Sequence, residues 1–542
     1  MSNDRFVLAG ARRLHRFQPK RLESVRTDME ISVTLTLRGK RNGPQVLAEL
    51  SNDVATMRRK PVAARTAIEL FSHSDRDELA VRRFAREHNL DFKTTGPSSI
   101  ELHGTVGDLN PAFGVKLSHY AESKHPATYH AHDDEITIPA YLSRIVTGVF
   151  GLDTHRIGHR PGFSHSMSAL SISPPSVTAK TRAPAEFGHL YNFPAQTTGR
   201  KQSIGLLEFG GGFRLSELKA YFKSVGAAFP RIVVKEIGRG ANRPCGKPHT
   251  LNPDTEVYMD IEVAGCLAPD ATLVVYFGED TEQGWLKTLR SAIFDEQHDL
   301  SVISISWGEA EQDWTPRATA EIDRLFQVAA HRGITICCSS GDNGVTELSG
   351  HPFTVAFPAT SPHVLACGGT QLDVRRNGSR NETVWNQWRQ YKLASGGGVS
   401  QVFPLPAFQK KAKVPNSDSG GHRRGRGIPD VAANASSKTG YLIEADRTRM
   451  SMGGTSAAAP LWAALVARLN EALGTKIGFI TPLLYEMRST TADTICDIVK
   501  GFNGPTRARG YQAKRGWDAC TGLGSPDGEK ILQWLMARQK KR

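Results

Sequence analysis

Short apolar runs that alternate with helical stretches constrain the fold of this chain more than any other feature. The runs lie at 203–209, 271–277, 302–308 and 333–340 and read SIGLLEF, ATLVVYF, VISISWG and GITICCSS. Segments with helical periodicity alternate with them: TEVYMDIEVAGCLA, EQGWLKTLRSAIFDE and ATAEIDRLFQVAAHR. Apolar strands alternating with helices predict an α/β fold, in which a parallel sheet is covered on both faces and binds ligands beyond the carboxyl ends of its strands.

The length of 542 residues exceeds what one hydrophobic core usually supports. Residues 161–184, PGFSHSMSALSISPPSVTAKTRAP, are typical of an exposed, protease-accessible linker. We therefore expect an N-terminal domain at 1–160, the linker, and a large domain at 185–542. The first of these is predicted to be a small α+β unit, because ISVTLTLR and SIELHGTV alternate like strands and SDRDELAVRRFAREHN has helical periodicity after an N-cap, Ser74.

Composition narrows the functional classes. The formal charge is +14, but Lys and Arg are spread along the chain without a nucleic-acid-binding motif, so we expect no nucleic-acid partner. No apolar stretch is long enough for a membrane span, and the first 21 residues lack the apolar core of a secretory signal. The seven cysteines show no metal-binding spacing, and most are expected to be small buried hydrophobic residues. The Gly/Arg-rich segment NSDSGGHRRGRGIPD, 416–430, is predicted to be a surface loop.

A serine before a long helix is the first candidate catalytic residue. Ser456 lies in MGGTSAAAP, and a lone serine at such a junction is commonly an N-cap. GTSxAxP, however, resembles the nucleophile segment of subtilisin-like peptidases. A serine hydroxyl needs a neighbouring base, yet no histidine of the large domain lies in the HGT-type segment that such enzymes use.

Two carboxylates offer a different base. Glu256 and Asp260 are four residues apart in NPDTEVYMDIEVAG and so lie on one face of a predicted helix. They could form a solvated acidic face. Because the helix is mostly apolar, they could instead lie in a dry cleft and share a proton, which would supply a base that works in acid.

Five motifs occur in a specific order: EVYMDIEVAG, SISWG, SSGDNG, GGTSAAAP and GWDACTGLGSP. As a set they resemble the sedolisin family of serine-carboxyl peptidases, especially its kumamolisin-like members. The resemblance implies a subtilisin-like sheet preceded by a ferredoxin-like prodomain that acts as an intramolecular inhibitor. It also implies an acid-acting, self-processing, extracellular and monomeric endopeptidase that cleaves proteins and peptides.

Residue roles follow from the same resemblance. It makes Ser456 the nucleophile, Glu256 the general base, Asp260 its proton-sharing partner and Asp342 a protonated group of the oxyanion hole. Glu208 and Trp307 match members of the family's active-site hydrogen-bond network. The two edges of the substrate cleft are expected at Ser306 and Gly308, and at Gly396, Gly397 and Gly398. Some members have an acidic residue where this chain has Ala356 in VAFP, so a preference for basic side chains is left open.

A calcium site is also implied. Asp497 and Asp518 match the family's carboxylate ligands, and Ile498, Lys514 and Gly516 match its carbonyl donors. These are the hard oxygen ligands that calcium prefers. Lys514 stands where the family has glycine, so ligation there depends on the backbone conformation.

Histidines are concentrated near the N-terminus, where eleven of the eighteen precede residue 170. We hypothesise that His119, His125, His130 and His132 gain charge together below about pH 6.5 and loosen the prodomain from the cleft. The alternative is that they are exposed and uncoupled.

Two competing functions remain at this point. A histidine-dependent subtilisin-like protease would work at neutral to alkaline pH and would tolerate Glu256→Gln. A pseudo-peptidase scaffold would keep its N-terminal domain permanently in the cleft.

Overall fold

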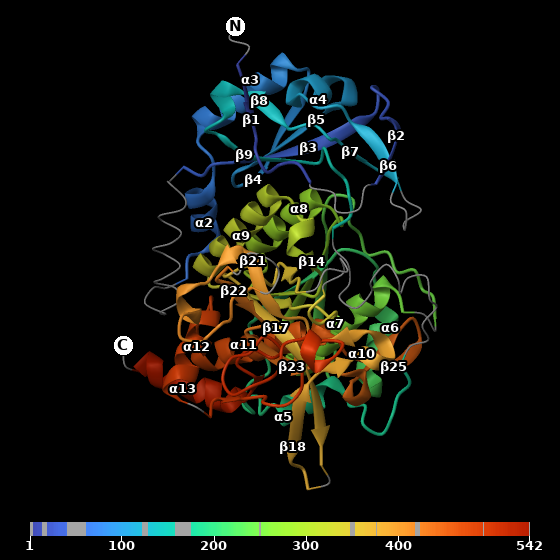
Figure 1. Cartoon of the computed structure of the whole chain (residues 1–542), viewed down its shortest axis with the longest axis vertical. Helices are drawn as coiled ribbons and strands as arrows, with labels where there is room; N and C mark the ends of the chain where they lie inside the picture. Colours follow the sequence, from blue (N-terminus) through green and yellow to red (C-terminus); the bar gives the residue numbers. More distant parts are fainter. Residues whose placement is uncertain are drawn as a thin grey trace.

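The chain is described by a computed structural model that covers residues 4–13, 19–40, 61–121, 128–157, 175–248, 251–346, 353–375, 377–417, 423–491 and 493–540. Figure 1 shows a small domain, formed by the first part of the chain, above a larger domain formed by the rest. The predicted linker falls outside the described residues as far as residue 174. In the described part of the chain, no helix has both the length and the apolar character needed to cross a membrane.

The N-terminal domain has the ferredoxin-like arrangement of four antiparallel strands and two helices. Its elements in chain order are β3 (Glu30–Leu37), α3 (Asp75–Glu87), β4 (Asp91–Gly96), β5 (Ser99–Thr105), α4 (Val106–Phe113) and β9 (Val146–Phe150). The sheet order is β4-β5-β3-β9. Ser74 caps α3 by accepting a hydrogen bond from the Asp77 amide, as the sequence predicts.

The first part of the chain also forms additional short elements. They are β1 (Arg5–Val7), which pairs with β8 (Thr137–Pro139), a three-stranded sheet of β2 (Lys20–Ser24), β6 (Ser118–Ala121) and β7 (Thr128–Ala131), and the helix α2 (Ala64–Phe71).

The large domain is built on one eight-stranded sheet. Its strands are β10 (Ser203–Glu208), β11 (Arg231–Glu236), β12 (Thr272–Phe277), β13 (Val302–Ile305), β15 (Thr335–Ser339), β17 (Leu365–Val374), β18 (Arg380–Val384) and β23 (Val431–Asn434). They run in the order β11-β12-β10-β13-β15-β17-β18, and β23 also pairs with β17. All pairs are parallel except β17 with β18, so the α/β prediction is confirmed with one antiparallel strand added.

Helices cover both faces of this sheet. One buried cluster includes side chains of α7 (Pro253–Leu267) and α11 (Thr455–Leu473), and the other includes side chains of α8 (Glu282–Ile293) and α9 (Pro316–His331). Further helices are α5 (Pro184–Leu190), α6 (Leu215–Ser224), α10 (Trp388–Tyr391), α12 (Thr481–Thr490) and α13 (Gly528–Lys540). The large domain also contains short strands, which are β14 (Glu309–Ala310), β16 (Ala356–Phe357), β20 (Leu393–Ala394), β21 (Gly398–Pro404), β22 (Gly425–Ile428), β24 (Tyr441–Ala445) and β25 (Thr448–Met452).

The N-terminal domain docks on α8 and α9, as Figure 1 shows. The Gln283 amide on α8 donates to the Ser32 carbonyl at 3.1 Å. Lys287 Nζ lies 2.7 Å from a Glu101 carboxylate oxygen. From α9, Arg317 donates to the Thr147 carbonyl at 3.0 Å. Polar contacts from both helices therefore hold the small domain on the large one.

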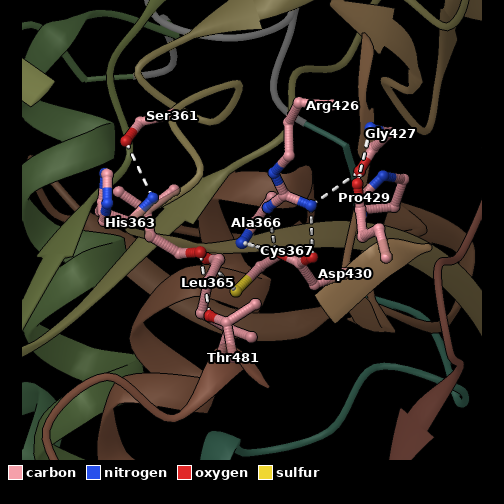
Figure 2. Close-up of polar contacts among 12 residues, drawn as sticks. Ser361, His363, Leu365, Ala366, Cys367, Arg426, Gly427, Pro429, Asp430 and Thr481 are labelled. Carbon is pink, nitrogen blue, oxygen red and sulfur yellow. Dashed lines mark hydrogen bonds and ion pairs between the residues drawn. The ribbon is translucent and has the colours of Figure 1, made fainter. Parts of the chain in front are cut away.

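The surface-loop prediction for 416–430 is wrong for the last part of that segment. Arg426 and Asp430 have no exposed surface and form a bidentate ion pair, with nitrogen–oxygen distances of 2.6 and 2.5 Å (Figure 2). Asp430 also accepts a hydrogen bond from the Ala366 amide at 2.8 Å, which ties the segment to β17. Gly and Arg are typical of loops, but here the carboxylate four residues on neutralises the arginine and permits its burial. Residues 418–422 lie outside the described part.

Candidate active site

Three neighbouring parallel strands end at the site. β10 ends at Glu208, β13 is followed by Ser306 and Trp307, and the chain after β15 reaches Asp342. Because β10, β13 and β15 are adjacent, their carboxyl ends place these residues along one edge of the sheet. The Trp307 indole nitrogen donates to a Glu208 carboxylate oxygen at 3.0 Å, and both residues are buried. The structure thus joins the predicted Glu208 and Trp307 directly.

Ser456 lies in the first turn of α11. The N-cap of this helix is Gly454, with φ of 97°, so Ser456 is not the cap and that alternative is wrong. Only 2% of Ser456 is exposed. Its hydroxyl lies 3.5 Å from the Ser306 carbonyl oxygen, a long contact that leaves the hydroxyl free to turn toward another acceptor.

Asp342 is fixed against the turn that carries the nucleophile. The Thr455 amide and hydroxyl both donate to Asp342 Oδ1, each at 2.7 Å. The other oxygen, Oδ2, would lie 2.6 Å from a Cβ at position 454, so only glycine fits there. Thr455 was not singled out from the sequence, although its place in the GTS motif could have indicated it.

The acidic pair lies on α7, a helix buried all round. The Asn252 side chain caps the helix by accepting from the Asp254 amide, and Pro253 occupies its first turn. Glu256 and Asp260 both have 0% exposure. A solvated acidic face is therefore excluded, and the shared proton stays a prediction.

Ser306 connects the acidic pair to the nucleophile. Its hydroxyl lies 2.8 Å from Asp260 Oδ1 and 3.2 Å from the Ser456 carbonyl oxygen. One side chain thus contacts α7 and α11 at the same time. The structure brings Asp260, Ser306 and Ser456 together at the site that the sequence predicts.

The two segments predicted to be cleft edges lie in glycine-containing loops and short strands, and their contact with substrate stays a prediction. Gly308 precedes β14, which pairs antiparallel with β16, where Ala356 lies opposite Ala310. The Gly396 amide donates to the Gly341 carbonyl at 2.7 Å, and its own carbonyl accepts from Ser340 Oγ at 2.7 Å. The backbone N–H and carbonyl of Gly396 therefore form hydrogen bonds within the protein. Substrate contacts at Gly397 and Gly398 stay a prediction.

The described histidines of the large domain do not form a catalytic triad with Ser456. His298 Nδ1 lies 2.8 Å from Asp295, and His363 Nδ1 lies 2.9 Å from Asp323. His298, His331 and His363 each precede a sheet strand, so they lie at the edge opposite the nucleophile, and His189 belongs to α5. The remaining three, His249, His351 and His422, are outside the described residues.

The predicted calcium ligands are compatible with a hard cation. Asp497 Oδ1 is buried and has no hydrogen-bond partner among the described residues, while Oδ2 accepts from Arg488 and from the Gly516 amide, each at 2.8 Å. Burial raises the pKa of Asp518 to about 6, although several amides, including that of Lys514, donate to it. A bound cation would satisfy Asp497 Oδ1 and favour an ionised Asp518.

The backbone around these ligands tolerates the Lys514 replacement. Gly516 has φ of 83°, a conformation that favours glycine, and Lys514 is not among the residues with positive φ. The lysine at position 514 thus requires no unusual backbone conformation.

The prodomain histidines are partly buried and arranged on neighbouring strands. His119 on β6 lies opposite His130 on β7. Burial lowers the pKa of His130, and its Nε2 lies 3.2 Å from the Gly151 carbonyl oxygen. His132 is buried and its Nδ1 lies 2.8 Å from the Asp134 carbonyl oxygen. His125 is outside the described residues.

A buried ion cluster between the domains was missed by sequence reasoning. Arg13 lies 2.9 Å from Asp153 and 3.1 Å from Glu282, the first residue of α8. Burial raises the pKa of Glu282, although Arg13 opposes this. For Asp153, burial would raise the pKa, but Arg13 and His155 lower it to about 2. No local pattern marks these residues, because they are far apart in the sequence.

Comparisons with known proteins agree with this geometry. The pattern described as "Subtilase family" matches residues 238–513, and that described as "Pro-kumamolisin, activation domain" matches residues 18–155. Kumamolisin from Bacillus sp. (strain MN-32) is 40% identical over 543 residues, which cover 98% of this chain and 96% of that protein. Sedolisin from Pseudomonas sp. (strain 101) is 30% identical over 450 residues, covering 80% of this chain and 74% of sedolisin.

A solved structure supports the same assignment. Pseudomonas sedolisin in complex with pseudo-iodotyrostatin superimposes with a TM-score of 0.60 at 30% identity, covering 67% of this chain and 99% of that chain. The similarity to kumamolisin extends through both domains. The chain therefore belongs to the sedolisin family of serine peptidases and is a kumamolisin-like proenzyme with an N-terminal activation domain.

Proposed function

We propose that this protein is an acid-acting serine-carboxyl endopeptidase that processes itself. The observation that carries the proposal is the Ser306 hydroxyl, which contacts both Asp260 and the Ser456 backbone. This link between Asp260 on α7 and the turn that carries Ser456 supports the proposal. The described histidines that precede strands of the large domain also support it, because they lie at the opposite edge of the sheet.

In the proposed reaction, Glu256 takes the hydroxyl proton of Ser456 as its oxygen attacks the substrate carbonyl carbon. The carbonyl becomes a tetrahedral oxyanion, to which protonated Asp342 donates a hydrogen bond. Glu256 then gives the proton to the leaving amine, and an acyl-enzyme forms. Water attacks this ester by the same route in reverse and frees Ser456.

Acid operation follows from the proton requirements of the site. Asp260 shares one proton with Glu256, and Asp342 must be neutral, because an ionised carboxylate would repel the oxyanion. Both conditions are met more fully as pH falls, until Glu256 itself is protonated.

The prodomain is proposed to inhibit the enzyme until acid weakens its docking. Glu256, Asp260, Asp342 and Ser456 are all at most 4% exposed in this proenzyme. Protonation of Glu282 would remove one ionic partner of Arg13, and protonation of His130 would place a charge in a buried position. Through these two changes, a fall in pH would weaken the docking of the prodomain on the large domain.

The remaining features of the proposal rest on the family. Proteins and peptides are the proposed substrates, and the enzyme is proposed to be an extracellular monomer. Asp497 and Asp518, with the carbonyls of Ile498, Lys514 and Gly516, would hold one calcium ion. The ion would supply positive charge that neutralises these carboxylates and stabilises the C-terminal loops.

The test is the pH profile of cleavage of a denatured protein by the full-length chain. Wild type should cleave below about pH 5, and Ser456→Ala and Glu256→Gln should each lose about a thousandfold or more in kcat. Glu296→Gln, at an exposed carboxylate, is the matched control and should retain full activity.

Mass spectrometry on the same samples separates the competing functions. After a shift to about pH 4, a fragment starting near residues 171–180 should appear in wild type and be absent in Ser456→Ala. Full activity of Glu256→Gln with a neutral optimum would instead support a histidine-dependent protease. No cleavage and no fragment at any pH would support a scaffold.

A further inference from the structure

A proline four residues after the nucleophile deprives the Ser456 carbonyl of its usual hydrogen-bond donor. In an α-helix, a carbonyl accepts a hydrogen bond from the amide four residues on. For Ser456 that position is Pro460, inside α11, and proline has no N–H. The Ser456 carbonyl therefore lacks its usual donor within the helix.

The Ser306 hydroxyl is placed to be that donor. It lies 3.2 Å from the Ser456 carbonyl oxygen and 2.8 Å from Asp260 Oδ1, and Ser306 has 0% exposure. The contact is reciprocal, because the Ser456 hydroxyl lies 3.5 Å from the Ser306 carbonyl oxygen. The two serines therefore fix each other at the junction of β13 and α11.

The number of protons available for these contacts then distinguishes an ionised from a protonated Asp260. A hydroxyl has one proton to donate and two lone pairs to accept with. If Asp260 is ionised, Ser306 donates to one of its two neighbours at a time, and the other contact is not a hydrogen bond. If Asp260 carries a proton, it donates to Ser306, and Ser306 donates to the Ser456 carbonyl. Only the second state makes both short contacts hydrogen bonds.

The surrounding acids favour a proton in this cluster. Glu256 shares α7 with Asp260, Glu208 ends β10 beside Trp307, and Asp342 follows β15. Carboxyl groups gathered in a buried region cannot all ionise together. A proton is therefore available for Asp260, and Glu256 can be the ionised member of the pair.

We propose that Ser306 is a positioning residue whose hydroxyl holds the shared proton on Asp260, leaves Glu256 as the ionised base, and anchors the carbonyl of Ser456. This inference rests on the proposed function. It assigns to the Ser306 side chain a role distinct from the substrate contact expected for its backbone.

The experiment compares Ser306→Ala with Ser306→Thr, which keeps a hydroxyl. kcat and KM for a fluorogenic peptide are measured from about pH 3 to 8. Ser306→Ala should lower kcat about 10- to 100-fold with KM changed less than about twofold. The alkaline limb of its pH profile should move down by about half to one pH unit, because the proton on Asp260 loses its acceptor.

Ser306→Thr should restore the position of that limb. The matched control is Ser361→Ala, which removes a buried hydroxyl that donates to Asp323 at 2.6 Å away from the site and should leave the profile unchanged. Figure 2 shows Ser361 beside His363. Melting temperatures at pH 4 check folding, and Ser306→Cys replaces the alanine variant if that variant does not fold.

An unmoved alkaline limb in a folded Ser306→Ala variant would overturn the inference. A limb that moves to higher pH would also overturn it, because the hydroxyl would then donate to an ionised Asp260. Neither result contradicts the proposed function, which is instead refuted if Ser456→Ala or Glu256→Gln remains active.

Discussion

Glu311 offers a prediction whose size follows from the structure. This carboxyl is 1% exposed and lies just after β14. Its oxygens accept from Ser400 Oγ and from the Gln401 amide, each at 2.6 Å, and so join it to β21. Burial raises the pKa of Glu311 from its ordinary 4.5 to about 7, although these hydrogen bonds act in the opposite direction.

The sign of the effect on stability follows from proton binding. Between about pH 4.5 and 7 the folded protein holds a proton on Glu311 that the unfolded chain has released. The free energy of unfolding therefore falls as pH rises, by about 1.4 kcal/mol per pH unit, to a total of about 3 kcal/mol. This contribution is complete below pH 4.5 and lost above pH 7.

Glu311→Gln should remove this dependence, because glutamine is neutral at every pH and has a similar shape. In a Ser456→Ala background that cannot digest itself, the variant should match its parent at pH 4. At pH 8 its free energy of unfolding should exceed that of the parent by about 3 kcal/mol. Urea unfolding followed by tryptophan fluorescence at each pH measures the difference.

Glu296→Gln, at an exposed carboxylate, is the control and should follow the parent at every pH. The reasoning is refuted if Glu311→Gln keeps the pH dependence of its parent. It is also refuted if the variant is less stable than its parent at both pH 4 and pH 8. The carboxyl would then be needed for its hydrogen bonds and would not be neutralised by burial.

Three other predictions concern activation and the proposed calcium site. Arg13→Ala should leave Asp153 and Glu282 buried without their cation and allow prodomain release at a higher pH, measured by gel electrophoresis of processing, whereas the exposed Arg12→Ala should not. His130→Gln should slow acid-triggered processing, since burial lowers the pKa of His130 and its buried state is therefore favoured above about pH 6.5 and disfavoured as pH falls; an unchanged rate would exclude this histidine as a trigger. Calcium chelation should lower the melting temperature of wild type and leave that of Asp497→Asn unchanged; equal effects on both would place any bound calcium elsewhere.

Much of the fold could be predicted from local pattern. The expected strand at 203–209 is β10, and the acidic pair lies on the helix where its spacing placed it. Each of these features depends on neighbours in the sequence, such as an apolar run or a capping residue. The segment at 416–430 shows the limit, because the burial of Arg426 depends on packing that its glycine-rich composition does not reveal.

The sequence by itself singled out the residues that are proposed to carry the chemistry, since Ser456, Glu256 and Asp260 stand in short motifs whose spacing is local. Only the tertiary structure decided how they are linked. Ser306 and Ser456 are 150 residues apart, and Arg13 is far from Glu282 in the chain. Contacts of this kind depend on the tertiary fold, and so does the burial that raises the pKa of Glu282, Glu311 and Asp518. Desolvation depends on the whole surrounding fold, and no local pattern of residues encodes it.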